Sequence, residues 1–85
     1  MSGFRLSSTV IAAPDPRALA ACYRSLLDWE TRDDEPDWVV LKPRGTGQGA
    51  ATGLAFQRET EHVPPRWPAT GGDQQMQAHL DIGVP

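Results

Sequence analysis

The chain is poor in three features that mark common classes of protein: cysteine, long apolar runs and excess positive charge. Cys22 is its only cysteine, so no internal disulfide can form, which is typical of a protein kept in the reducing cytoplasm. No apolar stretch approaches the ~20 residues of a membrane-spanning helix, and the N-terminus has no signal-peptide pattern. The formal net charge of −3 argues against nucleic-acid binding, which calls for a basic surface. We therefore predict a cytoplasmic protein that binds neither membrane nor nucleic acid.

Apolar residues are also in short supply. With 85 residues, of which 39% are hydrophobic, the chain has room for at most one domain with a small core. Eight prolines and eight glycines indicate many turns rather than long helices.

Periodicity nevertheless predicts one helix and several short strands. Asp15 is suited to cap a helix and Pro16 to occupy its first turn. Apolar residues then recur at spacings of three and four as far as Leu27, and the helix should end near Leu27 or Asp28. Alternating or β-branched stretches predict strands, which we place at residues 4–13, 29–32, 38–41 and 52–57. An acidic turn is expected at 33–36, and the last three strands can pair as a meander, giving an α+β fold.

A short repeat suggests how the chain is divided. Ser8–Pro14 and His79–Pro85 each have an isoleucine at the fourth place and a proline at the seventh, which indicates either a duplicated module or a chance similarity. We expect residues 1–57 to form a first βαβββ module and residues 58–75, rich in Pro and Gly, to form a linker. Residues 76–85 are then the first strand of an incomplete second module.

Several motifs resemble the vicinal oxygen chelate superfamily, which includes glyoxalase I, bleomycin-resistance proteins and extradiol dioxygenases. The likeness lies in the Pro14-Asp15 helix entry, the helix end Cys22-Tyr-Arg-Ser-Leu-Leu-Asp-Trp29 and the returning His79-Leu-Asp-Ile-Gly-Val84. The small bacterial glyoxalase-like domain proteins are similar at Phe56-Gln57, Pro64-Pro-Arg-Trp-Pro68 and Gln74-Gln-Met76. The resemblance covers essentially the whole chain. It implies a glyoxalase-like βαβββ module in a chain truncated within its second module.

The resemblance also implies where a metal would bind. Metal-dependent members take one ligand from the first strand of each module and one from near each module's end, and the ion holds two neighbouring oxygens of the substrate. The equivalent positions here are Ser8 or Thr9, Ala55 or Gln57, and His79, with the fourth beyond Pro85. His79 alone is a strong ligand for a divalent transition metal, and its alternative role is that of a hydrogen-bonded structural histidine. We expect a divalent cofactor only if a partner chain or a C-terminal half completes the site.

Three side chains are candidates for binding a small molecule: Gln57, Trp38 and Trp67. Gln57 either hydrogen-bonds a ligand or caps its strand. Trp38 either lines an apolar pocket or packs in the core, and Trp67, between prolines, could cover the sheet as a lid.

The resemblance leaves the activity open, because one scaffold hosts many functions. The first hypothesis is a metal-dependent lyase, isomerase or dioxygenase completed by another chain. The second is a resistance-type protein that binds a small hydrophobic ligand without catalysis, and the third is an inactive product. An uncovered sheet face and an exposed strand edge invite pairing with another chain, so we predict a homodimer or a higher homo-oligomer.

Overall fold

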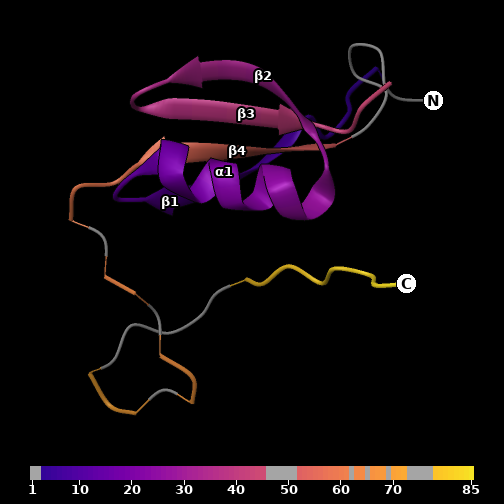
Figure 1. Cartoon of the computed structure of the whole chain (residues 1–85). Helices are drawn as coiled ribbons and strands as arrows, with labels where there is room; N and C mark the ends of the chain where they lie inside the picture. The colour runs from indigo at the N-terminus through magenta and orange to yellow at the C-terminus, as the bar shows by residue number, and fades with distance from the viewer. Residues whose placement is uncertain (1–2, 46–51, 62, 65, 69, 73–77) are drawn as a thin grey trace.

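One helix and four strands make up the fold in the computed structural model, which describes residues 3–45, 52–61, 63–64, 66–68, 70–72 and 78–85. In chain order the elements are β1 (Ser8–Ala13), α1 (Pro16–Leu27), β2 (Glu30–Glu35), β3 (Trp38–Lys42) and β4 (Gly53–Arg58). The helix lies along one face of the sheet (Figure 1). This is the predicted βαβββ order, and the α+β class is confirmed. No helix in the described part of the chain is long and apolar enough to cross a membrane.

Local sequence sets both ends of α1. A carboxylate oxygen of Asp15 accepts a hydrogen bond from the Ala18 backbone N–H at 3.3 Å, and Pro16 follows in the first turn, where no intrahelical N–H is needed. At the other end Asp28 adopts a left-handed conformation with φ of 54°, which stops the helix. The Nε of Arg44 donates to the Asp28 carbonyl at 3.0 Å. The predicted start and end of the helix are confirmed.

The sheet has the strand order β1-β4-β3-β2. β2 pairs antiparallel with β3, and β3 pairs antiparallel with β4, as the meander prediction requires. β1, in contrast, pairs parallel with β4. Parallel neighbours need a crossover connection, and the segment containing α1, β2 and β3 supplies it. As a result α1 lies on one face of the sheet and β1 forms one edge.

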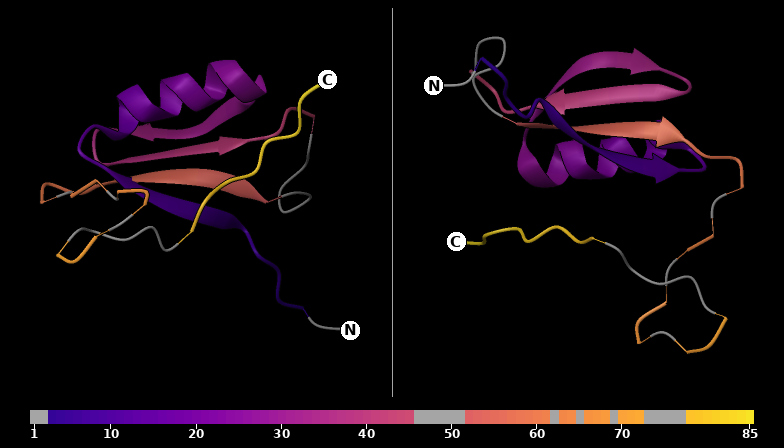
Figure 2. Two further views of the ribbon diagram at one scale, coloured as in Figure 1. Left: turned by 90° about the horizontal axis from the view of Figure 1, so that it is seen from below. Right: turned by 180° about the vertical axis from the view of Figure 1, so that it is seen from behind.

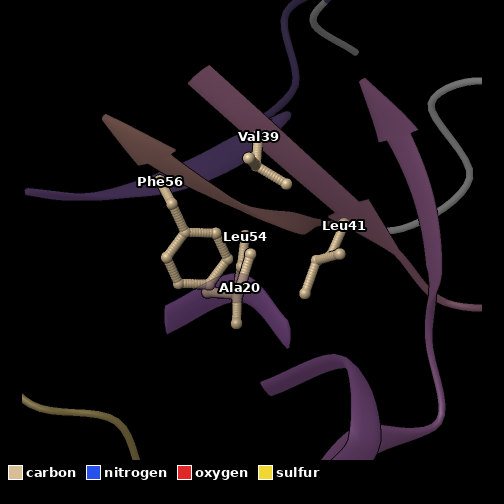
Figure 3. Close-up of a cluster of buried hydrophobic side chains, with 5 residues drawn as sticks. All are labelled: Ala20, Val39, Leu41, Leu54 and Phe56. Carbon is tan, nitrogen blue, oxygen red and sulfur yellow. The ribbon is translucent and has the colours of Figure 1, made fainter. Parts of the chain in front are cut away.

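The core lies between α1 and the central strands. Figure 3 shows five buried side chains that meet there: Ala20, Val39, Leu41, Leu54 and Phe56. Leu41 and Phe56 are 0% exposed, and the ring of Tyr23 stacks on Phe56 with centroids 5.6 Å apart. Partly buried side chains from β1, from α1 and from Trp29, just before β2, surround this cluster. The apolar stripe of α1 therefore packs on the sheet, as its spacing predicts.

Two predicted strand boundaries are wrong, and pairing explains both. The first strand begins at Ser8 rather than at residue 4, because its partner β4 begins at Gly53, directly opposite Ser8. β2 runs on through Asp33 and Asp34 to Glu35, which were expected in a turn. These acidic residues pair with β3 beyond an irregularity between Thr31 and Asp33. They are tolerated because β2 is an edge strand on which their side chains are exposed.

The last segment runs extended without joining the sheet (Figure 1). No strand is assigned to its described residues, 78–85, so the strand predicted there is not formed in this chain. Residues 76 and 77 of the same prediction lie outside the described residues. The described residues between Arg58 and the last segment contain no helix or strand, in keeping with the Pro/Gly-rich composition of the predicted linker.

Candidate functional site

The two faces of the sheet differ in what covers them. Successive side chains of a strand point to opposite faces, and those at Val39, Leu41, Leu54 and Phe56 pack toward α1. Figure 2 shows α1 along that face and no helix in the described chain along the other. We call the second face the open face; it carries Ser8, Val10 and Ala12 of β1, Trp38, Val40 and Lys42 of β3, and Ala55 and Gln57 of β4, with Glu30 and Glu35 of β2 opposite Lys42 and Trp38.

Trp38 and Gln57 lie together on the open face. They are direct partners in the register of β3 and β4, and opposed residues in antiparallel strands have Cβ atoms about 4.5–5.5 Å apart. Trp38 is half-buried and Gln57 is exposed. Beside them Val40 and Ala55 form a second opposed pair, 6% and 0% exposed. Two of the three predicted ligand-binding side chains therefore lie together, beside a buried apolar pair on the same face of the sheet.

A buried lysine that sequence reasoning missed occupies the other end of this face. Lys42 is 7% exposed, and its Nζ donates a hydrogen bond to the Ser7 carbonyl at 2.7 Å. Its aliphatic stem crosses Gly53 so closely that a Cβ there would lie 2.8 Å from the Lys42 Cδ. The stem is thus buried while the ammonium is bound to the backbone that leads into β1. The signal in the sequence is a strand-end lysine followed by a strand that begins with glycine, but it becomes meaningful only once the register is known.

The other two predicted site residues lie elsewhere. Trp67 is 80% exposed in the segment that extends away from the sheet after β4 (Figure 1). The Nε2 of His79 lies 3.5 Å from an Asp81 carboxylate oxygen. His79 also lines an open hollow of about 460 Å³ together with Thr9 and Tyr23. Since Tyr23 belongs to α1, this hollow is on the helix side of the sheet rather than beside Trp38.

The residues present do not fit a resident metal ion. Within the described part of the chain, no group of three or more His, Cys, Asp or Glu side chains is placed to hold one. Among the positions that the resemblance implies, Ser8, Ala55 and Gln57 lie on the open face, whereas Thr9 and His79 line one hollow on the helix side, where Asp81 is the acidic neighbour of His79. A divalent transition metal needs several nitrogen, sulfur or carboxylate ligands around one point. No catalytic step is therefore assigned to a metal here.

The arrangement of elements and the sequence motifs agree with one family. The family model described as glyoxalase-like domain matches residues 8–85, from the first residue of β1 onward. No curated protein and no solved structure matches the chain. The βαβββ order is the arrangement that the resemblance implies. The chain therefore belongs to the glyoxalase-like domain family.

Proposed function

We propose that this protein binds a small apolar ligand on the open face, at Trp38 and Gln57, without carrying out metal-dependent catalysis by itself. The observation that carries the proposal is the direct pairing of these two residues beside the apolar pair Val40 and Ala55. An indole ring offers a flat apolar surface, and an adjacent amide both donates and accepts hydrogen bonds. A few polar groups set in a mainly apolar surface are typical of small-molecule sites.

The chemistry of the open face favours one class of ligand. Val10, which is 49% exposed, and the half-buried ring of Trp38 offer accessible apolar surface that suits a hydrocarbon or aromatic body. The Gln57 amide suits a single carbonyl or hydroxyl at the Trp38 end. We therefore expect a compact aromatic molecule with one neutral polar substituent.

We further propose that a second copy of the chain covers part of this surface. β1 is an edge strand in the described sheet. Phe4 and Leu6, just before it, are 93% and 71% exposed, and Val10 within it is 49% exposed. Large exposed apolar side chains beside an unpaired strand edge favour association. A homodimer would bury these exposed side chains and would enclose the ligand site on the open face more deeply.

Fluorescence titration with N-phenyl-1-naphthylamine, a neutral aromatic probe, tests the ligand proposal. Trp38→Ala should weaken binding about tenfold, which corresponds to roughly 1.4 kcal/mol, a reasonable value for a stacked aromatic contact. Leu26→Ala is the matched control, since Leu26 is a 63% exposed apolar residue of α1. Equal affinity in both variants would contradict the proposal. Gln57→Ala should weaken the binding of a carbonyl-bearing aromatic such as acetophenone but leave the binding of the hydrocarbon naphthalene unchanged. Trp67→Ala tests the lid predicted for that ring, because loss of a lid should also weaken the binding of the probe.

Two measurements separate this proposal from the alternatives. Light scattering after size exclusion should give twice the mass of one chain, and a stable monomer at micromolar concentration would contradict the dimer. Metal analysis of the purified protein tests the enzyme hypothesis. A stoichiometric divalent metal that is lost in His79→Ala would favour a lyase, isomerase or dioxygenase whose site is completed by another chain, and it would overturn the non-catalytic proposal.

A further inference from the structure

Residues 78–85, here called the strap, have the side-chain pattern of a strand that packs on one face. Leu80, Ile82 and Val84 alternate with His79, Asp81 and Gly83. Leu80 and Ile82 are 39% and 40% exposed, whereas Val84 is 83% exposed. On the other side of the strap, His79 and Asp81 have side chains 63% and 93% exposed. Leu80 and Ile82 are therefore less exposed than Val84, and His79 and Asp81, although largely exposed, also border the hollows between the strap and the rest of the chain.

The surface beneath the strap is the groove between α1 and β1. Leu80 and Ile82 share a hollow of about 290 Å³ with Leu27, Trp29 and Leu54, near the end of the helix. Toward its N-terminal end the strap shares the hollow of about 460 Å³ with residues that include Thr9, Ile11 and Tyr23. Figures 1 and 2 both place the strap beside α1 and β1. The strap thus lies along an edge of the hydrophobic core, where α1 does not cover the core side chains.

Side chains rather than backbone pairing hold the strap in this groove. Among the described residues, no backbone hydrogen bond joins the strap to β1, although β1 is an edge strand. The connection from β4 comprises residues 59–77, which can span on the order of 60 Å when extended. The longest dimension of the molecule is 44 Å. The strap can therefore leave its own groove and reach the groove of a neighbouring molecule.

We propose that in the homodimer the strap of each copy occupies the α1–β1 groove of the other. This proposal rests on the dimer proposed above. The occupant follows from the structure, because the segment seated in the groove belongs to this chain and a second copy carries the same segment. Within one chain the connection keeps the strap at a high effective concentration near its own groove. Exchange therefore requires that the partner's groove be held equally close to the strap, and the dimer contact provides that proximity. The hollow beside Thr9 and Tyr23 would then receive His79 from the partner.

Disulfide trapping between differently tagged copies tests the exchange. Cys22 is the only cysteine and is exposed, so it is first replaced in Cys22→Ser. One copy then carries Thr9→Cys and the other His79→Cys; the two positions line the same hollow. Both residues are exposed, so neither substitution disturbs the core. The matched control replaces Thr9→Cys by Ser8→Cys, one residue away on the opposite face of β1. We expect at least about tenfold more cross-linked heterodimer with Thr9→Cys than with the control.

The outcomes distinguish the exchange from the dimer on which it rests. Equal cross-linking in the two mixtures, with light scattering still showing a dimer, would overturn the exchange and leave the dimer standing. A monomer in light scattering would overturn both. A second variant carries Thr9→Cys and His79→Cys in one chain. If its disulfide forms only within single chains in the dimer fraction, the strap stays in its own groove and the exchange is wrong.

Discussion

Replacement of Gly53 by alanine tests the closest backbone approach in the sheet. A Cβ at this position would lie 2.5 Å from the Leu41 carbonyl oxygen and 2.8 Å from the Lys42 Cδ, well inside the ~3.5–4.0 Å of favourable carbon contacts. Gly→Ala in a strand without such contacts stabilises a protein by roughly 0.5–1 kcal/mol. Forcing a methyl group into a packed site costs about 1–3 kcal/mol and occasionally more. Because the Leu41 oxygen is a backbone atom next to the β3–β4 pairing, we expect the cost to lie in the upper part of this range and the net loss to be about 1–2 kcal/mol.

Urea unfolding followed by circular dichroism measures this loss. For a domain of this size the dependence on urea is about 1 kcal/mol per molar, so the midpoint should fall by about 1–2 M. Gly71→Ala is the matched control, because an added Cβ at Gly71 meets nothing within 4 Å. The control should unfold within about 0.5 kcal/mol of the parent protein. A midpoint for Gly53→Ala equal to that of Gly71→Ala would refute the close approach and the register that produces it.

A double-mutant cycle identifies the atom responsible. Lys42→Ala removes the side chain at 2.8 Å from the added Cβ but leaves the Leu41 carbonyl oxygen at 2.5 Å. If the backbone contact dominates, as its shorter distance implies, Gly53→Ala should remain destabilising in the Lys42→Ala background. A complete loss of the Gly53→Ala effect there would instead assign the strain to the lysine stem.

Three further predictions concern the fold. Phe56→Ala removes a side chain that is 0% exposed and should destabilise the protein by about 3–5 kcal/mol, enough to unfold much of it in thermal scans; an unchanged melting temperature would contradict the core assignment. Asp15→Ala removes the helix cap and should cost about 0.5–2 kcal/mol in urea unfolding, whereas Asp15→Asn should retain most of that stability. The Nε of Arg17 lies 2.7 Å from an Asp34 carboxylate oxygen, but the two side chains are 51% and 60% exposed. Arg17→Ala should therefore lower the free energy of unfolding by less than about 1 kcal/mol, and by less still at high salt. A larger, salt-independent loss of stability would show that Arg17 acts through packing.

The candidate site shows where prediction from sequence stopped. Trp38 and Gln57 were predicted individually, from the positions of two strands, and their direct opposition depends on the register of β3 and β4. His79 was predicted from its place in a returning motif, but its neighbours Thr9 and Tyr23 come from β1 and α1. Lys42 gave no signal of its own, because its burial depends on a glycine in the next strand. Each of these contacts joins residues that are distant in sequence.

Local patterns were sufficient for the elements and the family. The cap at Asp15, the apolar stripe that ends at Leu27 and the apolar run after Trp38 determined one helix and the order of strands, because capping and periodicity act within a few residues. Tertiary structure alone decided that β1 pairs parallel with β4, that β2 extends through its acidic residues, and that residues 78–85 lie beside α1 and β1 without joining the sheet. These features depend on which strands exchange hydrogen bonds and which face α1 covers, and such long-range choices leave no periodic trace in the sequence.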